Sequence, residues 1–133
     1  MILKKIPYRF SYTAIFTLIS LILVFHVLIL TSIIPFDLVW GGRLETYQQM
    51  IRYELFSIFI NLCFVFFIAL KAGLIRAFLS VRFANVFLWV FAFIFFLNTL
   101  GNLFSLNSLE QMIFTPVTLV LSILTARVAI EKV

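Results

Sequence analysis

The chain has 133 residues, of which 65% are hydrophobic and only 11% are charged, whereas soluble domains average about 45–50% apolar and about 25% charged residues. Ten basic and five acidic side chains are too few to cover the water-exposed surface of a soluble fold of this size. The composition therefore excludes a disordered chain and an ordinary soluble enzyme, and it indicates that the natural solvent of the protein is lipid.

Few residues suit metal or cofactor chemistry. Cys63 is the only cysteine and His26 the only histidine, so the sequence offers no disulfide and no Cys-x-x-Cys redox pair. A zinc or haem site commonly takes several such ligands. The sequence also lacks a glycine-rich phosphate loop and a G-x-S-x-G elbow, which mark nucleotide sites and α/β-hydrolases. We therefore expect no metal and no cofactor.

Four apolar runs are long enough to cross a bilayer, which takes about 20 residues per helix. They cover about residues 12–34, 55–70, 83–104 and 112–130. The second run is the shortest, and we expect it to continue a helix that starts in the preceding loop. These runs leave no room for a soluble domain, so we predict an all-α fold: an integral membrane four-helix transmembrane bundle that forms a single domain over residues 1–133.

Basic residues concentrate in alternate connections between the runs. Arg43 and Arg52 lie in the first connection, and all the others fall on the opposite side of the membrane: Lys4, Lys5, Arg9, Lys71, Arg76, Arg82, Arg127 and Lys132. By the positive-inside rule, both termini are then cytoplasmic. We expect a multi-pass protein of the plasma membrane, in a bacterium the inner membrane. This pattern explains the net charge of +5 as an orientation signal, and we expect no nucleic-acid partner.

The first outer connection, residues 35–54, carries the densest chemistry. We interpret Trp40 as an anchor at the membrane interface, and the following Gly41-Gly42 pair favours a chain reversal. Thr46 and Gln49 have the spacing of a capping box, which predicts a helix that begins just after Thr46 and runs into the second span. The connection is either a solvated loop or a lid over a site within the bundle.

Polar side chains recur at helical spacing in the outer half of the spans. Glu54, Ser57 and Asn61 share one face of the second span. Asn98 and Asn102 share one face of the third, and we expect Gly101 between them to let a neighbouring helix approach closely.

Two further polar stripes follow the first and fourth spans. They consist of Thr13, Thr17, Ser20 and Thr31 in the first span, and of Thr115, Thr118, Ser122 and Thr125 in the fourth. We expect the polar faces to turn inward and the Phe-rich faces to meet lipid. Thr115 followed by Pro116 predicts the N-terminal cap and first turn of the fourth helix.

These polar groups have two interpretations. They either hold the helices together by hydrogen bonds or line an outward-open pocket, since polar groups within a membrane often mark a functional site. The candidate ligand-binding residues are Arg43, Arg52, Glu54, Asn61, Asn98, Asn102 and His26.

Three of these candidates carry more specific expectations. An arginine at the mouth of the pocket could grip an anionic head group bidentately. Glu54 would need a partner, for which Arg43, Arg52 and Asn102 are the candidates. His26, in the middle of the first span, is expected to bond a backbone carbonyl or a neighbouring helix, or else to contact a ligand or relay a proton.

The sequence therefore suggests a small multi-pass membrane protein that binds a lipid or small amphiphile from the outer side. One alternative is a structural or accessory subunit that docks another membrane protein or a second copy of itself. Another is an intramembrane enzyme that uses Glu54, His26 and Arg43 on a lipid. The sequence offers one acid and one base without a recognised nucleophile, which favours a non-enzymatic role.

Overall fold

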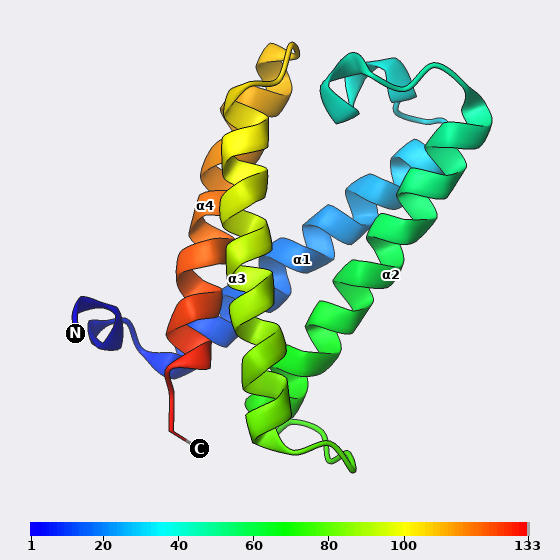
Figure 1. The fold of residues 1–133 in the computed structure, drawn as a ribbon. Helices are drawn as coiled ribbons and strands as arrows, with labels where there is room; N and C mark the ends of the chain where they lie inside the picture. Colours follow the sequence, from blue (N-terminus) through cyan, green and yellow to red (C-terminus); the bar gives the residue numbers. More distant parts are fainter. Residues whose placement is uncertain (133) are drawn as a thin grey trace.

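The computed structural model describes residues 1–132, and four long helices make up most of this part of the chain (Figure 1). Each of the four is long and apolar enough to cross a membrane, which confirms the prediction of an all-α fold with four candidate membrane spans. The long helices are α1 (Tyr8–Leu30), α2 (Tyr47–Lys71), α3 (Val81–Leu103) and α4 (Ser108–Ala129). The short 3-10 helices are η1 (Ile2–Lys5), η2 (Phe36–Leu38) and η3 (Trp40–Gly42).

Local sequence signals set the ends of α1 and α2. The Thr46 side chain accepts a hydrogen bond from the Gln49 amide, and the Gln49 side chain accepts one from the Thr46 amide, both at 3.2 Å. The predicted capping box is thus confirmed. Helix α1 ends at Leu30, before the apolar run ends, because Ser32 has a φ of 61°. The following amide, of Ile33, bonds back to the helix in the manner of a Schellman motif.

Helix α4 begins earlier than the apolar run suggested. Its N-cap is Asn107, whose side-chain oxygen accepts a hydrogen bond from the Leu109 amide at 2.9 Å. The prediction that Thr115 caps the helix is therefore wrong, and Pro116 lies inside the helix rather than in its first turn. Asparagine is as good a cap as threonine, and the polar first turn concealed it from a search for apolar residues. Gly101 is also not a point of close approach, because a Cβ there would meet nothing within 4 Å.

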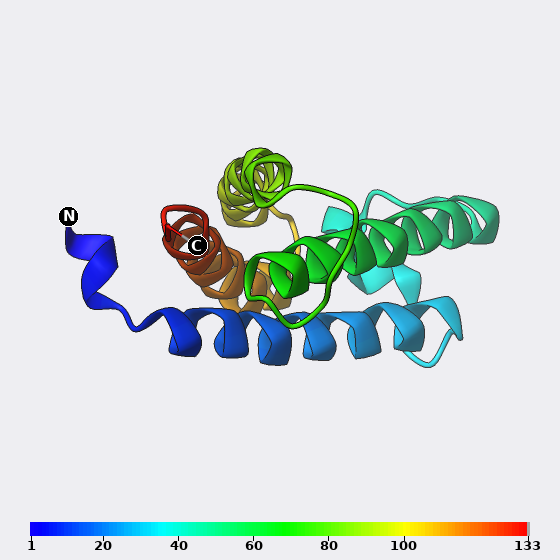
Figure 2. The same ribbon diagram turned by 90° about the horizontal axis from the view of Figure 1, so that it is seen from below.

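The four helices diverge toward one end of the molecule. Helices α3 and α4 lie side by side, and α1 runs along one face of the bundle in contact with both α2 and α4 (Figures 1 and 2). Helices α1 and α2 lean away from the other pair where residues 31–46 and 104–107 connect the helices (Figure 1). We call this the loop end, and the opposite end, with both termini, the terminal end.

An aromatic cluster fills the contact between α2 and α3. The ring of Phe64 lies 4.8 Å from that of Phe91 and 5.1 Å from that of Phe95, measured between centroids, and all three are buried. The expectation that Phe faces meet lipid is therefore wrong for these residues. Their large apolar area favours burial against other helices as much as exposure to lipid.

The polar stripe of α1 points outward, contrary to expectation. Thr13, Thr17 and Ser20 are exposed, and each hydroxyl donates to the carbonyl four residues earlier, at 2.8, 3.1 and 2.7 Å. A hydroxyl satisfied by its own helix can face lipid at little cost. The larger Ile15 and Ile19 occupy the buried face instead.

Thr118 and Ser122 of the α4 stripe bond to α3, as the hydrogen-bonding interpretation predicts for them. The Thr99 hydroxyl donates to the Thr118 hydroxyl at 3.0 Å, and the Ser122 hydroxyl donates to the Ala92 carbonyl at 2.8 Å. The hydroxyl groups of Thr115 and Thr125 are buried and have no partner within residues 1–132, so the interpretation fails for these two residues.

Two buried charged side chains, Lys71 and Arg127, form hydrogen bonds to the terminal segments at the terminal end. The Lys71 ammonium donates to the Glu131 carbonyl at 2.5 Å, and the Tyr8 hydroxyl donates to the Lys71 carbonyl at 2.8 Å. The Arg127 guanidinium donates to the Ile6 carbonyl at 2.7 Å and to the Glu131 carboxylate at 2.6 Å. The segments at both termini and the end of α2 are therefore joined at one end of the bundle.

Candidate functional site

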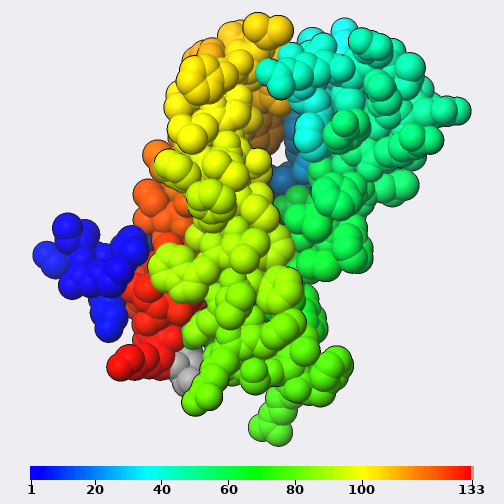
Figure 3. Space-filling model, in the orientation of Figure 1, coloured from blue at the N-terminus to red at the C-terminus, as the bar shows by residue number. Residues whose placement is uncertain are grey.

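A cavity of about 390 Å³ lies near the loop end, between the α1/α2 pair and the α3/α4 pair. This volume falls within the range of about 300–1,000 Å³ that is typical of small-molecule sites. The space-filling view shows a hollow between α3, in yellow, and the cyan and green segments of the loop and α2 (Figure 3). Phe56 of α2 and Ile94 of α3 belong to the lining and are also exposed, so they flank the opening.

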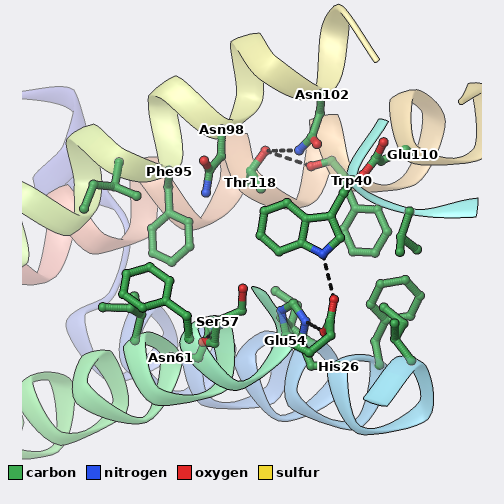
Figure 4. A pocket seen from close by; sticks show the side chains of 18 of the residues that line it. His26, Trp40, Glu54, Ser57, Asn61, Phe95, Asn98, Asn102, Glu110 and Thr118 are labelled. Carbon is green, nitrogen blue, oxygen red and sulfur yellow. Dashed lines mark hydrogen bonds and ion pairs between the residues drawn. The ribbon is translucent and has the colours of Figure 1, made fainter. Parts of the chain in front are cut away.

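The lining combines apolar and polar side chains. Ile, Val and Phe residues from all four helices and from the loop make up much of the wall. The polar members of the lining are His26, Trp40, Glu54, Ser57, Asn61, Asn98, Asn102, Glu110 and Thr118 (Figure 4). The structure thus brings together five of the seven candidate ligand-binding residues, together with Trp40.

Glu54 is the fully buried centre of the polar cluster. Its Oε2 lies 2.5 Å from Nδ1 of His26, and its Oε1 accepts a hydrogen bond from Nε1 of Trp40 at 2.7 Å. One proton must lie between Nδ1 and Oε2, because two lone pairs would repel at this distance. His26 therefore bonds a neighbouring helix, which was one of the expectations for it. Within residues 1–132, the hydrogen bond of the ring is made through Nδ1, which leaves Nε2 available.

The asparagines differ in how fully their amides are used. Asn61 donates to the Ser57 carbonyl at 2.8 Å, and Asn102 donates to the Thr118 hydroxyl at 3.4 Å. Asn98 points from α3 into the cavity (Figure 4) and is exposed there. Its side chain makes no hydrogen bond to any residue in the described part of the chain. It is therefore the amide with the most capacity for a ligand.

The loop between α1 and α2 crosses the cavity and is fixed on both sides. Trp40 reaches α2 through Glu54, and the Gly41 amide donates to Oε2 of Glu110 in α4 at 2.8 Å. The Asn107 side chain also donates to the Leu38 carbonyl. Trp40 and Gly41 both have positive φ, 55° and 67°, a conformation that is strained for a tryptophan. Several contacts together hold this strained turn over the cavity.

Arg43 and Arg52 lie outside the larger cavity. Arg43 lines a separate hollow of about 240 Å³ beside Trp40, and Arg52 is exposed on α2. Neither arginine contacts the Glu54 carboxylate, and neither does Asn102. The prediction that one of these three is the partner of Glu54 is therefore wrong. The turn of positive φ at Trp40, Gly41 and Gly42 places the Trp40 indole against the Glu54 carboxylate instead.

Glu110 is a polar lining residue that neither the polar stripes nor the candidate ligand-binding residues included. Its Oε2 accepts from the Gly41 amide and also from the Ser105 hydroxyl at 2.5 Å. The contact with Gly41 joins positions 69 residues apart, so no local spacing could reveal it. The phenylalanines of the lining, such as Phe25 and Phe114, resembled other apolar span residues in the sequence.

The site offers hydrogen bonding and a paired imidazole and carboxylate. Residues 1–132 contain no group of three or more His, Cys, Asp or Glu side chains placed to hold a metal ion. No protein-family model, curated protein or solved structure matches the chain. The chemistry of the cavity is therefore the basis for assigning a function.

Proposed function

We propose that the protein is a non-enzymatic integral membrane protein that binds a lipid or small amphiphile in the cavity at the loop end. The amphiphilic lining carries this proposal. Polar groups gather around His26, Glu54 and Asn98, and Ile and Phe side chains form the rest of the wall. A molecule with a polar head and an apolar tail satisfies both parts at once.

The position of the opening supports the same function. Phe56 and Ile94 flank it on the outward faces of two membrane-spanning helices, where lipid tails would lie. The loop that carries Trp40 closes the cavity toward the loop end. An amphiphile would therefore enter from the bilayer between α2 and α3.

A bulky side chain in the cavity tests this proposal. Ser57→Phe places an aromatic ring inside the lining, whereas Ser20→Phe places the same ring on the exposed face of α1. Native mass spectrometry of the purified variants should show an amphiphile bound to the wild type and to Ser20→Phe, but not to Ser57→Phe. An adduct that persists unchanged in Ser57→Phe would refute binding in this cavity.

We further propose that the loop end faces outward from a bacterial inner membrane and that both termini are cytoplasmic. The exposed basic side chains at the terminal end support this orientation. They are Lys4, Lys5, Arg9, Arg76, Arg82 and Lys132.

A pair of cysteine variants tests the orientation. In a Cys63→Ala background, Phe104→Cys exposes a thiol at the loop end and Phe78→Cys exposes one at the terminal end, because both phenylalanines are exposed. A membrane-impermeant maleimide applied to intact cells should label only Phe104→Cys. Labelling of Phe78→Cys alone would reverse the orientation.

The second candidate function is an intramembrane enzyme, and the His26–Glu54 pair is the observation that favours it. A carboxylate on Nδ1 orients the imidazole and leaves Nε2 open to the cavity, which is how a general base is commonly held. If the protein is an enzyme, His26→Gln should abolish turnover of an added lipid while amphiphile binding persists. A lipid extract that the wild type leaves chemically unchanged would contradict this candidate.

A further inference from the structure

The cavity is acidic in its charged groups. Glu54 and Glu110 are the carboxylates of the lining, its basic group is the His26 imidazole, which is already paired with Glu54, and the described lining residues include no lysine or arginine. Both oxygens of Glu54 are already bonded to His26 and Trp40. Arg43 belongs to a different hollow. An anionic head group would thus meet carboxylates without a compensating guanidinium or ammonium, and close like charges cost several kcal/mol.

The remaining hydrogen-bonding capacity of the cavity is uncharged or acidic. Within residues 1–132, the Asn98 side chain makes no hydrogen bond, and His26 makes its hydrogen bond through Nδ1, which leaves Nε2 available. Glu110 uses only Oε2, so its Oε1 can accept a hydrogen bond. His26 comes from α1, whereas Asn98 and Glu110 come from α3 and α4. A head group between them could bond to opposite walls of the cavity (Figure 4).

We infer that the cavity selects an amphiphile whose head group donates hydrogen bonds through hydroxyl or amine groups and carries no negative charge. This inference rests on the proposed function, because it specifies the ligand of that same site. The head group lies below Trp40 between His26 and Asn98. The tail leaves between Phe56 and Ile94.

Three probes that share one tail test this selection. Oleyl alcohol, oleylamine and oleyl sulfate differ only in a hydroxyl, an ammonium or a permanently anionic sulfate head. The chain has two tryptophans, and Trp89 is exposed on α3 away from the lining. In phosphatidylcholine vesicles, which contain no other protein, a Trp89→Phe variant therefore reports binding through the fluorescence of Trp40, its one remaining tryptophan.

Oleyl sulfate should bind at least about tenfold more weakly than the tighter of the other two probes, which is a modest effect for a like charge within the cavity. The tighter probe identifies whether the head group is a hydroxyl or an ammonium. A smaller difference would overturn the selection against anions while leaving amphiphile binding intact. Absence of binding by all three probes would overturn the proposed function as well.

Two glutamate variants trace the selection to the cavity. Glu110→Gln removes a charge from the lining but keeps an oxygen that can accept from the Gly41 amide. Glu45→Gln removes a charge from the exposed part of the loop. The factor by which oleyl sulfate binds more weakly than the tighter-binding probe should fall about tenfold in Glu110→Gln. The same factor should stay unchanged in Glu45→Gln. Equal changes in both variants would assign the selection to the surface of the protein and overturn the inference.

Asn98→Ala tests the direct contact. Its side chain is exposed and makes no hydrogen bond to another residue in the described part of the chain, so the variant should fold like the wild type. Loss of one hydrogen bond should lower the affinity for the tighter-binding probe by roughly three- to tenfold. Ser20→Ala, on the exposed face of α1, should bind as the wild type does. Wild-type affinity in Asn98→Ala would show that Asn98 does not recognise the head group.

Discussion

The hydrogen bonds of Glu54 to His26 and Trp40 lead to a prediction about the stability of the protein. Glu54→Met keeps much of the volume of the side chain but offers neither His26 nor Trp40 an acceptor. Glu54→Gln keeps a carbonyl oxygen for the Trp40 indole and an amide that can donate to Nδ1 of His26. The two variants therefore differ in hydrogen bonding at similar size, and we expect only Glu54→Met to be strongly destabilised.

The expected loss follows from the burial of each group. Removing one partner from a buried ion pair costs about 3–5 kcal/mol in soluble proteins, whereas a hydrogen bond between membrane helices averages about 0.6 kcal/mol. Glu54 is fully buried, but the His26 side chain is 14% exposed and Trp40 is 36% exposed. Water can therefore replace part of the hydrogen bonding that these two side chains lose in Glu54→Met. We expect a loss of about 2–4 kcal/mol for Glu54→Met and about 1 kcal/mol or less for Glu54→Gln.

Unfolding by sodium dodecyl sulfate in mixed micelles, followed by circular dichroism, measures these losses. The double variant His26→Leu/Glu54→Met serves as the control. Because it removes both partners, its loss should be smaller than the sum of the two single losses. Stabilities of Glu54→Met and Glu54→Gln that agree within about 0.5 kcal/mol, the usual limit of additivity, would refute the reasoning.

Other contacts predict further outcomes. Trp40→Phe keeps an aromatic ring but removes the donor to Glu54, so hydrogen exchange measured by mass spectrometry should speed up in η3 and stay unchanged in α4. The Arg127 side chain is buried and hydrogen-bonded at the terminal end, so Arg127→Met should lower the free energy of unfolding in sodium dodecyl sulfate by about 1.5–3 kcal/mol. Arg82 is exposed, so Arg82→Met should lower it little. Thr118→Val should lose about 1 kcal/mol in the same assay, while Thr17→Val should be near neutral because its hydroxyl bonds its own helix.

The sequence predicted the helices and placed several cavity residues on the correct faces. The capping box at Thr46 and the shared face of Glu54, Ser57 and Asn61 depend on spacings of a few residues, which helical geometry fixes in advance. The same periodicity failed for α1. A polar stripe shows which residues share a face, but it does not show whether that face is buried.

The sequence by itself determined that the chain has four helices long and apolar enough to cross a membrane, because hydrophobicity and helix length are local properties that the bilayer selects directly. Only the tertiary structure decided the partners of Glu54, the role of Glu110 and the exclusion of Arg43 from the larger cavity. These depend on how a turn of positive φ carries Trp40 and Gly41 across the gap between two helix pairs. The contact between Gly41 in the loop and Glu110 in α4 joins positions 69 residues apart, and no local pattern in the sequence records it.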